Sequence, residues 1–244
     1  MGAPATHLCR GSGNDMGMME ASAAGIVDAG PEGAALALRA KVLSRVIAAA
    51  VHDIRTPLNT LGLRLPLLAE SLEGSPVSPD VAAGQLRALR EQLDRIKDLV
   101  ARLAEVTEPA APLGYLDLAA YLAQVAGALG YDAKLHHVEF VLEPSRGSVR
   151  TSAEPERAGR LVLCLVSRAL GGTADGGRLL ARAVTRDGHA VVELDRTAAE
   201  PDRDLDYDFQ VLAADVGAAG GRLERAPHGG LERITLTMPG NERT

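Results

Sequence analysis

Two consecutive apolar stripes with helical spacing constrain the fold of this 244-residue chain more than any other feature. In the first, between residues 34 and 72, apolar residues recur every three or four positions: Leu43, Ile47, Ala50, Ile54, Leu58, Leu61, Leu65, Leu68 and Leu72. The second stripe follows a break at residues 73–77 and comprises Leu86, Leu89, Leu93, Ile96, Val100 and Leu103. Such spacing places all members of a stripe on one face of an α-helix. The sequence therefore predicts two long amphipathic helices, the second starting at Ser78-Pro79-Asp80, in an antiparallel hairpin.

A hairpin of two such helices would leave part of both stripes uncovered. Pairing of two hairpins into a four-helix bundle would bury the remainder, so the sequence predicts a homodimer. The alternative is a monomer whose hairpin packs on the C-terminal part of its own chain. We expect a leader at residues 1–33, a helical hairpin for dimerisation at 34–108 and, after the stiff linker Pro109-Ala110-Ala111-Pro112, a second domain at 113–240.

The second domain has a mixed pattern of helices and strands. Helical patterns cover residues 116–129, 156–170 and 207–219, and strand patterns cover 137–142, 178–184, 189–194, 222–225 and 233–238. The turn residues Arg186-Asp187-Gly188 and His228-Gly229-Gly230 separate neighbouring strands, as in β-hairpins. The fold class is therefore predicted to be α+β, with the helical hairpin followed by a sandwich that has helices on one face of a mostly antiparallel sheet.

Composition narrows the classes of function. The formal net charge is −6, whereas binding to a nucleic-acid backbone needs a basic surface, so we expect protein partners and no nucleic acid. No apolar stretch approaches the roughly 20 residues of a membrane-spanning helix, so no membrane association is expected. Of the two cysteines, Cys9 lies in the leader and Cys164 in an apolar run, which argues against a disulfide and favours a reducing cytoplasm.

His52 is the candidate catalytic residue, in the segment His52-Asp53-Ile54-Arg55-Thr56-Pro57-Leu58-Asn59. At this position of the first helix, its side chain is expected to point away from the apolar stripe. An unprotonated imidazole nitrogen is a good phosphate acceptor near neutral pH, because the free side chain has a pKa of about 6.5. Asp53 would hydrogen-bond the other ring nitrogen or take the proton released on transfer, as a general base or acid, and Arg55 would steady phosphate oxygens or pair with an acid. Pro57 would bend the helix nearby.

This segment resembles the phosphoacceptor box of two-component sensor histidine kinases, where a histidine, an acidic residue and an Arg-Thr-Pro-Leu run recur in that order. The resemblance extends over residues 35 to 240, strongly in the hairpin and weakly after it. It implies that His52 is the phosphoacceptor. It also implies that Thr56, three residues after Asp53, has a phosphatase role, in which it orients a water that dephosphorylates the partner regulator.

An ATP-binding domain follows the hairpin in that family, and its first motif is altered in this chain. The motif is an asparagine-rich box on a helix, whose side-chain oxygens hold Mg²⁺. Here Cys164 and Arg168 stand where the two asparagines are expected. A cation in the place of a metal ligand repels the metal, so the resemblance implies a degenerate nucleotide site.

Two further nucleotide motifs are altered in the same way. Asp195 matches an aspartate that reads adenine, but Thr197 and Ala199 replace the glycines that let the backbone approach the nucleotide. Asp206 and Asp208 stand at the place of a glycine-rich turn that cradles phosphate on backbone amides. Two acids there would repel phosphate.

The chain as a whole resembles dimeric histidine phosphotransferases built on a histidine-kinase scaffold with a degenerate ATPase-like domain. Our hypothesis is a phosphorelay protein that exchanges phosphate between His52 and the aspartate of response-regulator receiver domains without using ATP. No cofactor is expected to be bound, and Mg²⁺ would be supplied by the partner receiver domain. Two alternatives remain open: a divergent sensor histidine kinase that phosphorylates His52 from ATP, and a non-catalytic pseudokinase adaptor.

Overall fold

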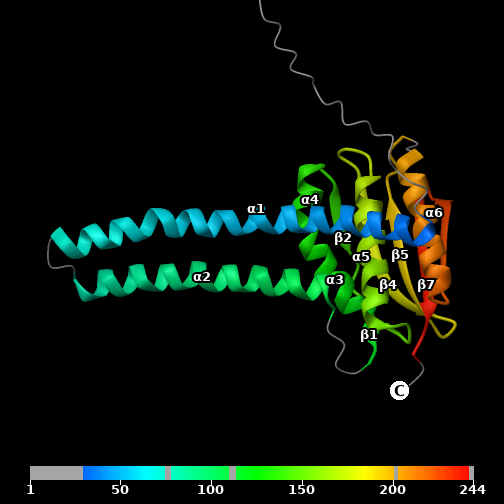
Figure 1. Ribbon diagram of the computed structural model, residues 1–244, viewed down its shortest axis with the longest axis horizontal. Helices are drawn as coiled ribbons and strands as arrows, with labels where there is room; N and C mark the ends of the chain where they lie inside the picture. The colour runs from blue at the N-terminus through cyan, green and yellow to red at the C-terminus, as the bar shows by residue number, and fades with distance from the viewer. Residues whose placement is uncertain (1–29, 75–77, 110–113, 201–202, 242–244) are drawn as a thin grey trace, which may run out of the picture.

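A long helical hairpin joins a compact layer of helices and strands in the computed structural model, which describes residues 30–74, 78–109, 114–200 and 203–241 (Figure 1). Helices α1 (Pro31–Gly74) and α2 (Pro79–Thr107) form the hairpin, with bounds close to the predicted ones. Helix α1 continues through Pro57, which cannot donate the usual helical hydrogen bond to the carbonyl of Asp53. The hairpin is confirmed as one unbroken helix followed by a second.

The second domain is an α+β sandwich, and this fold class is confirmed. In chain order its elements are β1 (Leu116–Asp117), α3 (Leu118–Ala128), α4 (Gly130–Leu135), β2 (Glu139–Leu142), β3 (Arg150–Thr151), α5 (Pro155–Gly171), β4 (Arg178–Arg186), β5 (His189–Arg196), α6 (Arg203–Ala218), β6 (Arg222–His228) and β7 (Leu231–Pro239). Strands β1 and β3 form a two-stranded antiparallel ladder. The other strands form a five-stranded sheet of order β2-β4-β5-β7-β6, in which β2 and β4 are parallel and the other pairs antiparallel.

Both predicted hairpin turns are present where the sequence places them. Asp187 and Gly188 have φ angles of 51° and 75°, and this pair of left-handed residues is what a tight two-residue hairpin between β4 and β5 requires. Gly229 and Gly230 have φ angles of 57° and 82° and join β6 to β7. Glycine adopts this backbone region without the steric cost that a side chain would bring.

Helix α1 packs on the second domain through a face that the sequence analysis did not identify. Leu38, Val42, Val46 and Ala49 are at most 4% exposed, and the first three belong to the same core as α5 and α6. The predicted stripe lies on another face, and its members Ile47, Leu58 and Leu65 are each about half exposed. Helix α1 therefore has two apolar faces, of which the chain's own second domain covers one.

Helix α4 is a second feature that was not predicted. The sequence analysis extended the preceding helix to residue 129 and assigned no element to residues 130–135. Six residues give fewer than two helical turns, which is too short for an apolar period to be recognised. Leu129 and Ala133, both nearly inaccessible, hold this segment in the core beside α1. Within the described residues, no helix has the length and apolar character needed to cross a membrane.

Candidate phosphoacceptor site

His52 lies on α1 just beyond the part of the helix that packs on the second domain. Its side chain is exposed, and its ring stacks on that of Tyr131 from α4, with the ring centroids 4.0 Å apart and the ring planes inclined by 26°. Ring stacking covers one face of the imidazole, whereas the nitrogen lone pairs and N–H bonds lie in the ring plane. The stacking on Tyr131 therefore does not cover the ring edge, where a phosphate would be accepted, and the residue as a whole is exposed.

Asp53 faces a different part of the structure from His52. It lines a small cavity of about 60 Å³ together with Arg102 of α2 and Gly127 and Ala128 at the end of α3. Successive helical residues are rotated by about 100°, which explains why the two neighbours diverge. The predicted roles of Asp53 as general base and as partner of the imidazole remain predictions.

Arg55 and Thr56 complete the predicted catalytic set, and both are exposed on α1. The backbone carbonyl of Thr56 accepts a hydrogen bond from the hydroxyl of Thr60 at 3.1 Å, one turn further on. Both side chains are therefore accessible to a partner protein that approaches α1. Their predicted roles in phosphate binding and in hydrolysis remain predictions.

Two residues of the altered nucleotide motifs form a buried ion pair. Arg168 of α5 and Asp208 of α6 are 4% and 8% exposed, and the Arg168 Nε lies 2.8 Å from the Asp208 Oδ2. Lys41 of α1 also reaches this carboxylate, with its Nζ 3.2 Å from the same oxygen. Lys41 of α1 thus places a second cation beside Arg168, where the resemblance expects a metal ligand. The carboxylate of Asp208 is paired with both cations.

Cys164, the other residue at an expected asparagine position, is buried within the same helix. Its side chain lies near Leu38 and Arg39 of α1 and Leu212 of α6. Burial raises the pKa of the Cys164 thiol to about 12, so the thiol is neutral at physiological pH. A neutral, enclosed thiol behaves as a small apolar group, and Cys164 contributes to packing at this position.

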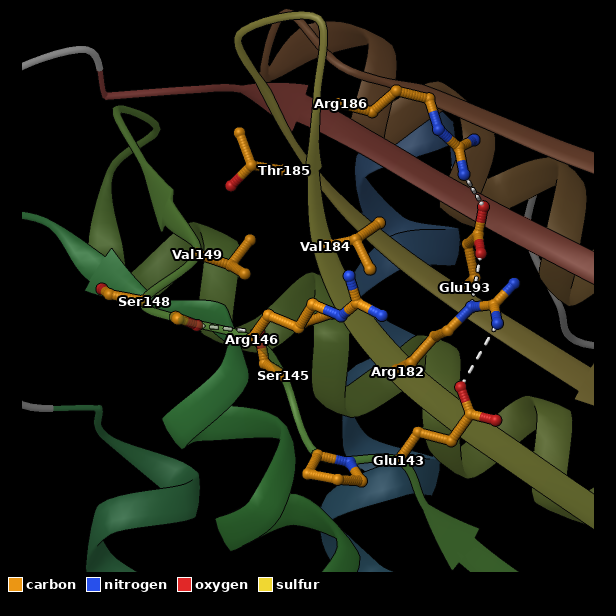
Figure 2. Close-up of a pocket in the computed structure, with 13 residues that line it drawn as sticks. Glu143, Ser145, Arg146, Ser148, Val149, Arg182, Val184, Thr185, Arg186 and Glu193 are labelled. Atoms are coloured by element: carbon orange, nitrogen blue, oxygen red, sulfur yellow. Dashed lines mark hydrogen bonds and ion pairs between the residues drawn. The ribbon is translucent and has the colours of Figure 1, made fainter.

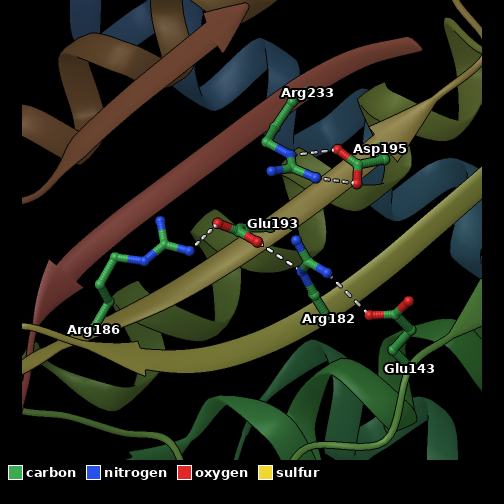
Figure 3. Close-up of polar contacts among 6 residues, drawn as sticks. All are labelled: Glu143, Arg182, Arg186, Glu193, Asp195 and Arg233. Atoms are coloured by element: carbon green, nitrogen blue, oxygen red, sulfur yellow. Dashed lines mark hydrogen bonds and ion pairs between the residues drawn. The ribbon is translucent and has the colours of Figure 1, made fainter. Parts of the chain in front are cut away.

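Asp195 lies on the opposite face of the sheet from Arg168 and Asp208. Strand β5 continues to Arg196, two residues beyond its predicted end, and side chains alternate between the faces of a strand. Arg196 points to the helix layer, where its guanidinium lies 5.9 Å from the ring of Phe209. Asp195 points the other way and accepts two hydrogen bonds of 2.6 Å from Arg233 of β7 (Figure 3). These bonds lower the pKa of Asp195 below its usual value.

The remaining residues of the altered motifs have structural contacts. The hydroxyl of Thr197 accepts a hydrogen bond from the backbone N–H of Arg178, and the N–H of Ala199 donates to the carbonyl of Gly172. Asp206 forms an ion pair with Arg225 at 2.8 Å. The seven residues that the sequence analysis assigned to one degenerate site are therefore divided between the two faces of the sheet.

A ladder of charged side chains covers the open face of the sheet (Figure 3). Glu193, only 2% exposed, accepts hydrogen bonds from Arg182 at 2.6 Å and from Arg186 at 2.7 Å, and Arg182 also donates to Glu143 at 3.2 Å. Burial alone would raise the pKa of Glu193, but the two arginines outweigh it and lower the pKa. The sequence analysis missed this ladder, whose only signal is the alternation of charged and apolar residues in β4 and β5.

A hollow of about 640 Å³ adjoins the ladder. It is formed by the segment between β2 and β3 and by one side of β4, and Arg146 extends into it toward β4 (Figure 2). Glu143, Arg182, Arg186 and Glu193 lie along its wall, so the opposite charges there largely neutralise one another. In the described part of the chain, no group of three or more histidine, cysteine, aspartate or glutamate side chains is arranged to hold a metal ion.

Comparison with known proteins supports the predicted similarity of the helical hairpin to histidine kinases. Residues 42–109 match the His Kinase A (phospho-acceptor) domain family. Sensor histidine kinase RegB of Cereibacter sphaeroides is 36% identical over 110 residues, which are 43% of this chain and 21% of that protein. The chain thus matches about a fifth of the length of this relative.

Solved structures with a similar arrangement have low sequence identity to the chain. Histidine kinase AdeS of Acinetobacter baumannii is 18% identical, with 78% of this chain and 98% of that chain covered and a TM-score of 0.42. A bacterial phosphotransferase is 14% identical, with 80% and 95% covered and a TM-score of 0.40.

These comparisons bear on the hypotheses drawn from the sequence. The family match and the similarity to RegB favour the sensor-kinase alternative more than a protein limited to phosphotransfer. The expectation that autokinase activity is lacking receives no support from them. The chain is similar to histidine kinases, and the similarity of residues 42–109 is to their His Kinase A (phospho-acceptor) domain.

Proposed function

We propose that the chain is a phosphotransferase of a two-component system in which His52 carries phosphate and exchanges it with the aspartate of a response-regulator receiver domain. The observation that carries the proposal is the exposed His52 side chain, stacked on Tyr131, in a segment that matches a phosphoacceptor domain family. This role is common to the phosphotransferase and the sensor-kinase hypotheses.

Transfer would proceed by in-line displacement at phosphorus. An unprotonated ring nitrogen of His52 attacks the phosphorus of the receiver's aspartyl phosphate, the P–N bond forms, and the bond from phosphorus to the aspartate oxygen breaks with release of the carboxylate. As positive charge develops on the ring, the proton on the other ring nitrogen would pass to water, or to Asp53 after its side chain turns from the cavity that it lines toward the imidazole. Arg55, exposed near His52, would bind phosphate oxygens, and Mg²⁺ held by the receiver would neutralise charge during transfer.

We also propose that His52 receives its phosphate from a receiver domain and not from ATP. The support is the Lys41–Asp208–Arg168 cluster: a buried guanidinium occupies the expected place of a Mg²⁺ ligand, and the only nearby carboxylate of the altered motifs is held by two cations. Asp195, the expected adenine-reading residue, is bound by Arg233 on the other face of the sheet.

Autophosphorylation from ATP is the second candidate, because the hairpin family and the RegB similarity are those of histidine kinases. In that case a nucleotide would bind a site that does not use the three expected motifs. Phosphate would still be carried on His52, so the two candidates differ only in the phosphate donor.

A homodimer is part of the proposal. Two rows with heptad spacing remain between 47% and 53% exposed in a single chain: Val51, Leu58 and Leu65 on α1, and Leu86, Leu93 and Val100 on α2. Apolar side chains repeated every seven residues form the seam between helices of a bundle. A second hairpin would cover both rows.

One labelling experiment separates the hypotheses. The full chain and its His52→Ala variant are each incubated with γ-labelled ATP and Mg²⁺, and separately with labelled phospho-receiver domains. Label from a receiver that depends on His52, with none from ATP, supports the proposal. Label from ATP on His52 would establish the autokinase. If neither the wild type nor His52→Ala takes label, and both bind the receiver domain and affect its activity equally, the protein is a non-catalytic adaptor.

A further inference from the structure

We infer that Tyr131 is a positioning residue for phosphotransfer at His52, an inference that rests on the proposed function of His52. The two side chains come from separate parts of the chain, one from the phosphoacceptor helix α1 and the other from α4 of the second domain. Their rings stack with centroids 4.0 Å apart. Tyr131 thereby brings the second domain into direct contact with the reacting side chain.

Stacking restricts the imidazole in the way that in-line transfer needs. A free histidine side chain on a helix surface samples several rotamers and rotates broadly about its terminal bond. A phenol ring stacked on the imidazole disfavours rotations that would turn the nitrogens toward the protein. The in-plane lone pair stays accessible at the ring edge, so the nucleophile is held in an orientation that a phosphorus atom can approach.

The backbone that carries Tyr131 is firmly anchored. Leu129 and Ala133, on either side of it in sequence, are 0% and 3% exposed, and Asp132 is 8% exposed. The hydrogen bond from Arg39 to Asp215 at 3.0 Å and the contact of Lys41 with Asp208 at 3.2 Å tie α1 to α6 of the second domain. The position of Tyr131 over His52 is therefore fixed by the docking of the second domain on α1.

This arrangement assigns a task to the second domain that requires no nucleotide. Because Tyr131 covers one face of the imidazole, a receiver domain must approach from the ring edge or the open face. The docked second domain would then set the side from which the receiver domain approaches. Loosening of the contact between the second domain and α1 would change the rate of phosphate transfer at His52, although no residue of α1 is changed.

Three variants test the inference in single-turnover transfer from labelled phospho-receiver. Tyr131→Ala removes the ring, Tyr131→Phe keeps the ring without the hydroxyl, and Tyr207→Ala removes an exposed tyrosine of α6 as a matched control. An aromatic pair contributes a factor of about two to ten, so we expect Tyr131→Ala to slow the maximal transfer rate by up to about tenfold. The receiver concentration at half-maximal rate should not change, and Tyr131→Phe and Tyr207→Ala should match the wild type.

A spectroscopic measurement distinguishes positioning from a general loss of structure. The ring protons of His52 lie against an aromatic face, so their NMR signals should move downfield in Tyr131→Ala and stay in place in Tyr131→Phe. Equal transfer rates and equal His52 signals in Tyr131→Ala and the wild type would overturn the inference alone. A wild-type protein that takes no label on His52 from any donor would instead reject the proposed function.

Discussion

The guanidinium of Arg168 lies 2.8 Å from the carboxylate of Asp208, and both side chains are almost fully buried between α5 and α6. Lys41 of α1 approaches the same carboxylate from outside. A charge that is removed from water needs such a partner, because an uncompensated buried ion is far more costly than the pair. This cluster therefore stabilises the present packing of α1 on the second domain while it occupies a position expected to serve nucleotide binding.

Loss of one member of this pair should destabilise the fold. Asp208→Asn keeps the shape of the side chain but leaves the Arg168 charge buried, so we expect the free energy of unfolding to fall by about 3 kcal/mol. Urea denaturation followed by circular dichroism measures this. Lys97→Ala, which breaks the exposed pair of Lys97 with Asp94, is the control and should cost less than about 1 kcal/mol. Equal stability of Asp208→Asn and wild type would contradict the role given to the pair.

Replacement of both charges should be tolerated better than replacement of one. The double variant Arg168→Met with Asp208→Leu removes the buried guanidinium together with its partner, and apolar groups of similar size can substitute for buried ion pairs. We expect it to recover much of the stability lost in Asp208→Asn. If neither the wild type nor the double variant takes label from γ-labelled ATP, these two charges do not by themselves prevent autophosphorylation.

The exposed heptad rows predict where a dimer can be broken. Leu58→Glu combined with Leu93→Glu places carboxylates in both rows, and burial of a charge in an apolar seam is unfavourable, so the protein should become monomeric. Light scattering coupled to size-exclusion chromatography measures the mass. Asn59→Glu, one residue further along α1 and on a different face, should keep the mass of the wild type. A wild-type protein that is monomeric at high concentration would contradict the dimer.

The thiol of Cys164 should be unreactive in the folded protein. Its pKa is raised to about 12 by burial, so the thiolate that reacts with alkylating reagents is scarce at pH 8 and becomes appreciable only as the pH approaches 12. In a Cys9→Ser variant, iodoacetamide should modify Cys164 slowly in buffer and readily in denaturing urea. Fast modification of the folded variant, monitored by mass spectrometry, would show that Cys164 is accessible.

The pair of Asp195 with Arg233 predicts a dependence of stability on acid pH. The pKa of Asp195 is lowered in the folded state, so the carboxylate contributes stability that is present above its unfolded pKa of about 3.9 and is lost as the pH falls through the folded value. Arg233→Met should lower the free energy of unfolding at pH 7 by about 1–3 kcal/mol and flatten its decrease in acid. Arg222→Met, at an exposed pair with Glu224, serves as the control. Parallel acid profiles for Arg233→Met and wild type would contradict this account.

The sequence predicted the elements with strong periodicity and missed features that depend on tertiary contacts. The two hairpin helices and the strand pairs around Asp187 and Gly229 lie where predicted, because apolar periods and turn residues are local signals. Tyr131 was missed because α4 is short and because nothing in the sequence places it beside His52. The separation of Asp195 from Arg168 and Asp208 was also missed, because β5 extends two residues further than its apolar run and the face of a strand residue depends on its position in the ladder.

The continuity of α1 couples His52, the proposed phosphoacceptor, to both ends of the molecule (Figure 1). One helix, about 66 Å long at 1.5 Å per residue, is held by the second domain over its first half and carries an uncovered heptad row that begins at Val51, next to His52. Insertion of one residue between Ala49 and His52 would turn the imidazole by about 100° relative to the domain that carries Tyr131. Rotation of α1 about its axis in the hairpin would therefore also rotate His52, and would change the angle at which the imidazole meets a partner protein.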